Sequence, residues 1–180
     1  MTRHIALLRA INVGRGRQVP MKDLSALFAS LGARDVITYI QSGNVVFTPP
    51  PKGAPSTNKL AAAIEARFGF AVPVVLSSHA HMVETFEHNP FLERGEDRKL
   101  AHVAFLSGTP KITAGKALDV GARSPGDEGV LRGDVLYLHL ANGAGKSKVS
   151  ADWLDRALSV TATVRNWNTV EKLVELSGPS

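Results

Sequence analysis

The chain has no cysteine among its 180 residues. This absence excludes disulfide bonds, thiolate metal sites and a cysteine nucleophile, and it fits a protein of the reducing cytoplasm. No stretch approaches the roughly 18 apolar residues of a membrane-spanning helix, and the apolar run near the N-terminus is too short for a signal peptide. We therefore expect a soluble cytoplasmic protein, long enough to bury a large core without cross-links.

Acidic residues are missing before Asp23, whereas basic residues are frequent there: Arg3, Arg9, Arg15, Arg17 and Lys22. The whole chain has a formal charge of +5 and a pI near 9.7. Such an excess favours anionic partners such as phosphates or nucleic acid, because electrostatic attraction raises their local concentration. A solvated basic surface without a partner is the alternative interpretation.

The hydrophobic pattern of the first half alternates between the periods of strands and helices. Pro20 suits the first turn of a helix, and Pro73 suits a strand at the edge of a sheet. In the segment QSGN, Gly43 and Asn44 can supply the positive φ that a tight hairpin needs. The expected order is β-α-β-β-α-β-α, with strands at 4–8, 36–40, 44–48 and 72–76, and helices between Pro20 and Gly32, around Leu60, Ile64 and Phe68, and near 79–87.

Three short segments of the first half recur in the second half in the same order. His4-Ile-Ala-Leu-Leu matches His102-Val-Ala-Phe-Leu, Gly43-Asn-Val-Val-Phe matches Gly133-Asp-Val-Leu-Tyr, and Val83-Glu-Thr-Phe matches Val170-Glu-Lys-Leu. These matches indicate a duplicated unit. We expect an α+β protein of two ferredoxin-like (β-α-β-β-α-β) repeats, each with an extra helix and an antiparallel sheet. The expected domains are residues 1–88 and 100–180, joined by a linker at 89–99.

In a ferredoxin-like unit, the first strand-to-helix loop and the middle hairpin leave the sheet at the same end. The segments RAINVGRGR and QSGN should therefore be neighbours in space. Glycines there let backbone N–H groups turn toward a ligand, and arginines pair with phosphate or carboxylate. The candidate ligand-binding residues of this half are Arg9, Asn12, Gly14, Arg15, Gln41, Ser42 and Asn44. Alternatively, the glycines only turn the chain and QSGN is a structural hairpin.

The second half carries polar loops at the opposite end of its own sheet. ANGAGKSKVS lies between an expected strand and an expected helix, and VRNWN precedes the last helix. These segments add the candidate ligand-binding residues Lys146, Ser147, Lys148, Arg165 and Asn166. If the halves pack about a two-fold axis, both sets of residues would line a shared cleft, and we expect a ligand there.

Three catalytic or nucleotide-binding motifs are incomplete. GAGKS resembles the tail of a phosphate-binding P-loop, but Leu140 stands where that pattern needs glycine. GRG at residues 14–16 lacks the third glycine of the dinucleotide fingerprint, because Val19 occupies its position. Ser56 and Lys59 have the spacing of a serine–lysine nucleophile pair, but they stand at a helix start, where serine usually caps.

The histidines do not form a metal-binding pattern. His81 and His88 share a helical face with Glu84, but seven residues of helix separate the two histidines by about 10 Å, which is too far for one ion. We expect neither a metal ion nor a cofactor. Asn168 and Glu171 have capping-box spacing, so we expect Asn168 to cap the last helix.

The segments LLRAINVGRGRQVPMKDL, YIQSGNVVF, SKVS and TVRNWNTVEKL together resemble the bacterial domain-of-unknown-function family DUF1697, over essentially the whole chain. The resemblance implies a double ferredoxin-like arrangement, in agreement with the repeat. It implies no activity, because the family has no established catalytic residues. The departures are small: GRGRQ replaces a Gly-Lys-Asn type of loop, and SKV replaces the common SKL.

These patterns together predict a protein that binds an anionic ligand, either a small molecule (a nucleotide or a phosphorylated metabolite) or a short nucleic acid. Only Tyr39 and Phe47 are candidates for the stacked aromatics with which such sheets bind RNA, which favours a small ligand. An enzyme acting on a phosphorylated small molecule and a non-catalytic interaction module are the alternatives. We expect no membrane partner.

Overall fold

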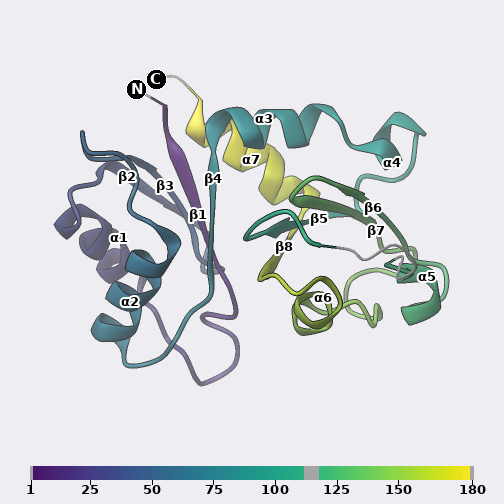
Figure 1. Cartoon of the computed structure of the whole chain (residues 1–180), viewed down its shortest axis with the longest axis horizontal. Helices are drawn as coiled ribbons and strands as arrows, with labels where there is room; N and C mark the ends of the chain where they lie inside the picture. Colours follow the sequence, from purple (N-terminus) through teal and green to yellow (C-terminus); the bar gives the residue numbers. More distant parts are fainter. Residues whose placement is uncertain (1, 112–117, 179–180) are drawn as a thin grey trace. The chain divides into compact units, whose positions relative to one another are not determined.

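The computed structural model describes residues 2–111 and 118–178. The chain divides into a first unit, formed by residues up to Val83 together with those from Leu173 onward, and a second unit, Glu84–Lys172. Each unit contains one four-stranded antiparallel sheet (Figure 1). The predicted linker at 89–99 falls within the second unit. No helix of the described residues is both long enough and apolar enough to cross a membrane.

The first unit has the predicted order of elements. They are β1 (His4–Leu8), α1 (Met21–Ser30), β2 (Arg34–Tyr39), β3 (Asn44–Thr48), α2 (Thr57–Phe68), β4 (Val74–Ser78) and α3 (His79–Glu87), of which α3 continues into the second unit. The strand order is β2-β3-β1-β4, with antiparallel neighbours. Helices α1 and α2 cover one face of this sheet (Figure 1), where Phe28 and Ile64 share a buried core with Leu8 and Phe47.

The second unit repeats the same arrangement. Its elements are α4 (Pro90–Glu93), β5 (Ala101–Leu106), α5 (Val120–Arg123), β6 (Glu128–Arg132), β7 (Val135–His139), α6 (Ala151–Leu158), β8 (Ala162–Asn166) and α7 (Trp167–Ser177), of which α7 ends in the first unit. The strand order β6-β7-β5-β8 is the same permutation as in the first unit. Leu136 and Leu138 pack with Leu154 of α6 in a second buried core. The predicted α+β fold of two ferredoxin-like halves is confirmed.

Local sequence signals account for the ends of the first-unit helices. Pro20 precedes the first residue of α1. The Ser56 hydroxyl accepts a hydrogen bond from the Lys59 backbone N–H at 3.3 Å, so this pair caps α2 as the capping interpretation predicts. Helix α2 ends at Gly69, whose φ is +83°. Pro73 precedes β4, which lies at an edge of the sheet.

The VRNWN segment differs from its prediction. The sequence pattern predicts a polar loop there, but β8 runs through Asn166, because the backbone pairs with β5 as far as His102. Helix α7 then begins directly at Trp167. The Asn166 side-chain oxygen accepts a hydrogen bond from the Thr169 N–H at 2.9 Å. Asn166 therefore caps the helix, and the prediction of Asn168 as the cap is wrong.

Candidate functional site

Two loops of the first unit meet at one end of its sheet. We call residues 9–20 the basic loop and residues 40–43 the hairpin loop. Antiparallel pairing of β1 with β3 places the end of β1 beside the start of β3, and so beside the hairpin loop. The Asn12 side-chain amide donates a hydrogen bond to the Gln41 carbonyl at 2.9 Å. The predicted proximity of the two loops is confirmed.

Asparagine side chains hold these loops in shape. The Asn12 amide nitrogen also donates to the Val19 carbonyl at 3.0 Å, and its oxygen accepts from the Val19 N–H at 2.7 Å. Buried Asn44 donates to the Tyr39 carbonyl at 3.1 Å and to the Ser42 hydroxyl at 3.0 Å. Both amides therefore have structural roles, and direct ligand contact by either of them stays a prediction.

Backbone conformations with positive φ cluster in the two loops. Ala10, Asn12 and Gly14, at alternate positions, have φ values of 55°, 54° and 66°. Arg17 and Ile40 add values of 53° and 48°. Four of the six non-glycine residues with positive φ in the described chain thus lie here. Each of these four non-glycine conformations costs roughly 1–3 kcal/mol, and the Asn12 N–H donates to the Arg17 carbonyl at 3.0 Å, which closes the basic loop on itself.

The hairpin loop packs directly against the end of β1 through Gly43. The Leu8 N–H donates to the Gly43 carbonyl at 2.8 Å. A Cβ atom on Gly43 would lie 2.6 Å from the Leu8 Cβ and 2.9 Å from the Ile11 Cδ1, and the φ of Gly43 is +83°. No other residue type fits this position without displacement of its neighbours. The two loops therefore form a tightly joined surface at this end of the sheet.

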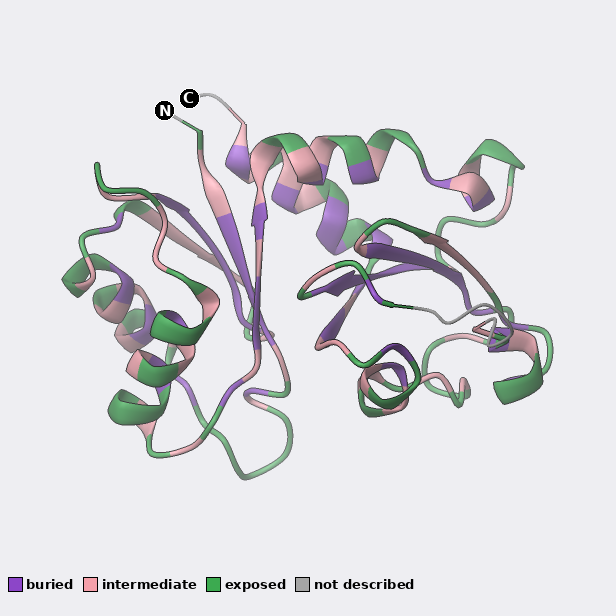
Figure 2. Ribbon diagram, viewed as in Figure 1, coloured by how far each residue is buried: buried purple, intermediate pink, exposed green. Residues whose placement is uncertain are grey.

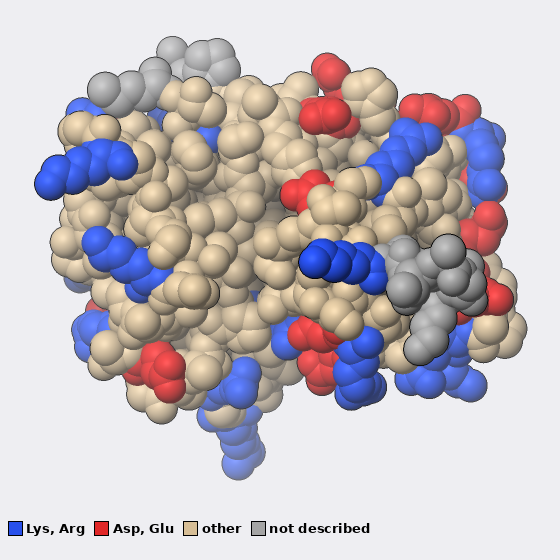
Figure 3. All heavy atoms as spheres, viewed as in Figure 1, with Lys and Arg blue, Asp and Glu red and all other residues tan. Residues whose placement is uncertain are grey.

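The outer surface of the joined loops is both basic and apolar. Arg15 is exposed, and the Arg17 guanidinium carbon lies 5.9 Å from the centre of the Phe70 ring. Val13 is 72% exposed and Ile40 is 50% exposed, and these are the exposed large hydrophobic residues of the described chain. Figure 2 shows the turn of the basic loop as exposed, and in Figure 3 basic side chains project from the same region. The surface therefore offers positive charge beside aliphatic side chains.

Sequence analysis did not select Val13 or Ile40. An apolar residue inside a glycine-rich, polar loop is the signal that identifies Val13. The sequence pattern places Ile40 at the end of a strand at 36–40, but β2 ends at Tyr39, and Ile40 turns with a positive φ into the hairpin loop. The local pattern does not distinguish Ile40 from a strand residue, because β-branched residues are typical of strands.

The polar loop of the second unit is held by hydrogen bonds to α5 and to the turn before β6. The Ser147 hydroxyl donates to a carboxylate oxygen of buried Asp127 at 2.6 Å. The Arg123 Nε donates to the Lys148 carbonyl at 3.0 Å. Ser147 therefore has a structural role, whereas Lys146 and Lys148 are exposed. Ligand contact by these two lysines stays a prediction.

Arg165 lies inside the second unit. Val103 of β5 pairs with Arg165 on one side and with Tyr137 on the other, so these three residues share one face of the sheet. Arg165 is only 8% exposed, and its Nη1 donates to the Val164 carbonyl at 3.0 Å. Burial lowers the pKa of Arg165 to about 10, because desolvation disfavours the charged form. The sequence pattern places this guanidinium on a polar loop, whereas it lies within a strand.

The predicted ligand-binding residues therefore form two sets. The first unit brings together Arg9, Asn12, Gly14, Arg15, Gln41, Ser42 and Asn44 in the basic loop, the hairpin loop and the first residue of β3; the second unit holds Lys146, Ser147, Lys148, Arg165 and Asn166. Among the described residues, no three His, Asp or Glu side chains are placed to hold a metal ion. The first set has the concentrated left-handed backbone and the exposed apolar residues, so it is the stronger candidate site.

Comparison with known proteins identifies the family. A family model described as a protein of unknown function (DUF1697) matches residues 1–137. No curated protein matches the chain. The solved structure of conserved bacterial protein SP0830 from Streptococcus pneumoniae is similar with a TM-score of 0.64 and 23% sequence identity, over 98% of this chain and 99% of that chain, which supports the fold alone. Because the family model spans the first unit's sheet and both of its loops, the chain belongs to the DUF1697 family.

Proposed function

We propose that the protein binds a phosphate-bearing ligand with an apolar part at the basic loop and the hairpin loop of the first unit. A nucleotide, another phosphorylated metabolite of this kind or a short nucleic acid meets that description. One observation carries the proposal, namely that four non-glycine residues with positive φ gather in two adjoining loops. Such strain persists only where the surrounding structure enforces it, and it clusters at ligand-binding sites.

The chemistry of the loops supports this ligand class. Arg9 and Arg15 carry guanidinium groups, which pair with phosphate oxygens through two parallel hydrogen bonds. No acidic side chain precedes Asp23 in the sequence, so the loop itself contributes only positive charge. Val13 and Ile40 add an apolar surface for a base or another apolar group. Inorganic phosphate can use only the positive charge of the loops, whereas a nucleotide can use both the charge and the apolar surface.

The proposal is tested by calorimetric titration with AMP, a short oligoribonucleotide and inorganic phosphate, each at two salt concentrations. We expect AMP or the oligoribonucleotide to bind, and we expect salt to weaken binding, because phosphate contacts release counterions. Arg15→Ala should weaken binding by roughly tenfold. Lys59→Ala is the matched control, since it removes an exposed cation at the opposite end of the same sheet. A Lys146→Ala variant tests the predicted contact in the second unit separately.

The apolar part of the proposal has its own variant. Val13→Ser should weaken binding of AMP but leave binding of inorganic phosphate unchanged, because the serine removes apolar contact and no charge. Val13 is exposed, so the substitution leaves the core intact. Absence of binding by all three ligands, or equal losses in Arg15→Ala and Lys59→Ala, would contradict the proposal.

A further inference from the structure

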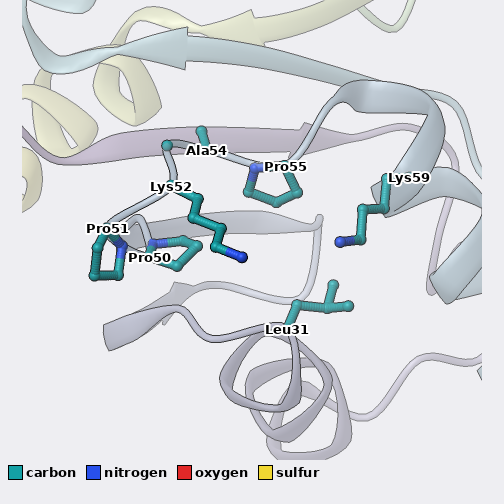
Figure 4. Close-up of a pocket in the computed structure, with 8 residues that line it drawn as sticks. Leu31, Pro50, Pro51, Lys52, Ala54, Pro55 and Lys59 are labelled. Atoms are coloured by element: carbon teal, nitrogen blue, oxygen red, sulfur yellow. The ribbon is translucent and has the colours of Figure 1, made fainter.

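A hollow lies at the other end of the first unit's sheet, away from the basic loop. It has a volume of about 470 Å³ and is formed by the end of α1, the loop after β3 and the start of α2 (Figure 4). Its lining residues are Leu31, Pro50, Pro51, Lys52, Gly53, Ala54, Pro55 and Lys59. This volume lies within the range of small-molecule sites, which is about 300–1,000 Å³.

The walls of this hollow are rigid. The Gly53 N–H donates to the Pro50 carbonyl at 2.9 Å, which closes a β-turn with Pro51 and Lys52 at its two central positions. Proline fixes φ, so this turn holds Lys52 with little conformational freedom in its backbone. Pro50 also packs closely on Gly32, where an added Cβ would lie 3.3 Å from the Pro50 Cβ. A ligand would therefore meet a largely preformed site, which lowers the entropic cost of binding.

The floor is apolar and the rim is cationic. Leu31 and Ala54 pack against the buried core of the first unit, so the floor is continuous with that core. Figure 4 shows the side chains of Lys52 and Lys59 pointing toward each other across the hollow, above Leu31. Within the described chain, no carboxylate lies within 4.0 Å of either ammonium group. Two like charges that face each other are unfavourable, and an anion between them relieves the repulsion.

We infer that this hollow binds a small amphiphilic carboxylate, with its apolar body on Leu31 and the prolines and its carboxylate between Lys52 and Lys59. A carboxylate has two oxygens, one for each ammonium group. The hollow has no arginine fork among its lining residues, in contrast to the basic loop. The inference is independent of the phosphate-ligand proposal, because the two sites share no residue and lie at opposite ends of one sheet.

The test is calorimetric titration of the full chain with decanoate, decanol and acetate. We expect decanoate to bind, decanol to bind at least about fivefold more weakly because it lacks the charge, and acetate to show no binding because it lacks the apolar body. Lys52→Ala and Lys59→Ala should each weaken decanoate binding by roughly fivefold, and the double variant should weaken it further. Lys22→Ala is the matched control, because it removes an exposed cation of the same unit outside both proposed sites, and it should leave decanoate binding unchanged.

Three results would overturn the inference: no decanoate binding, equal binding of decanoate and decanol, or equal effects of Lys22→Ala and Lys59→Ala on decanoate binding. Both lysines are exposed, so their substitution does not threaten the core. As a second measurement, Ala54→Asp places a negative charge in the floor of the hollow and should abolish decanoate binding; unchanged binding in this variant would also overturn the inference. AMP binding by the same Ala54→Asp protein reports on the other site and keeps the two proposals separate.

Discussion

The close approach of the hairpin loop to β1 predicts a large loss of stability for Gly43→Ala. Two costs combine at this residue. A left-handed backbone costs an alanine about 1–2 kcal/mol more than a glycine, less roughly 0.4–1 kcal/mol for the reduced entropy of the unfolded chain. The added methyl group would also lie 2.6 Å from the Leu8 Cβ and 2.9 Å from the Ile11 Cδ1. Overpacking of this kind costs about 1–3 kcal/mol, so the total should be about 1–4.5 kcal/mol.

Gly69→Ala is the matched control for this prediction. Gly69 has the same φ of +83° and belongs to the same unit, but nothing lies within 4 Å of the position that a Cβ atom would take there. Gly69→Ala should therefore lower the free energy of unfolding only through the left-handed backbone, by about 1 kcal/mol or less. Urea unfolding followed by circular dichroism measures both variants, and hydrogen exchange of the β1 and β3 amides assigns the loss to the first unit. Equal losses for Gly43→Ala and Gly69→Ala would refute the packing argument.

Three further predictions concern single polar groups. Asn12→Ala should lower the free energy of unfolding by about 1–3 kcal/mol, because backbone groups of the basic loop and of the hairpin loop lose their partners; unchanged stability in urea unfolding would contradict this. Asn166→Ala should lower the free energy of unfolding by about 1 kcal/mol, and Asn168→Ala should leave it almost unchanged. Equal losses for the two variants in urea unfolding would argue against Asn166 as the cap. Tyr39 and Tyr137 are the two tyrosines of the chain, so ultraviolet titration of a Tyr39→Phe protein reports Tyr137 alone. It should show phenol ionisation near pH 12, because burial raises the pKa of Tyr137 to about 12. Folding favours the neutral phenol, so its stabilising contribution is complete below pH 10 and is lost as pH rises through 12; ionisation centred at 10 in the folded protein would contradict the burial argument.

The order of the strands and helices was predictable because hydrophobic periodicity is strong in this chain. The errors lie at element ends. Strand β2 begins at Arg34, two residues before its predicted start, because exposed Arg34 and Asp35 carry no apolar signal. Strand β4 begins at Val74 rather than at 72, after Pro73, which lacks the N–H group that a strand ladder uses. Both differences arise because backbone pairing, and not side-chain pattern, decides where a strand starts.

The candidate sites were predictable only in part. Ferredoxin-like connectivity fixes which loops share one end of a sheet, so the proximity of Asn12 and Gln41 followed from the order of elements. The hollow did not follow, because Leu31, Lys52 and Lys59 come from three segments whose distances depend on packing. Cap spacing alone also failed in the last helix, where the length of β8 decides which asparagine stands at the helix start.

The two units provide an internal test of whether the joined loops are a requirement of the fold. The register of the two sheets makes Asp134 the equivalent of Gly43, because β1 pairs Leu7 with Asn44 whereas β5 pairs Phe105 with Val135. The Leu106 N–H donates to the Asp134 carbonyl at 3.0 Å, just as the Leu8 N–H donates to the Gly43 carbonyl at 2.8 Å, but the second unit has a residue with a side chain at this position. The second sheet thus has the same topology and the same backbone hydrogen bond without a glycine at this position. The fold itself therefore does not require a glycine packed against Leu8 and Ile11, and this difference supports a functional explanation for the surface of the first unit.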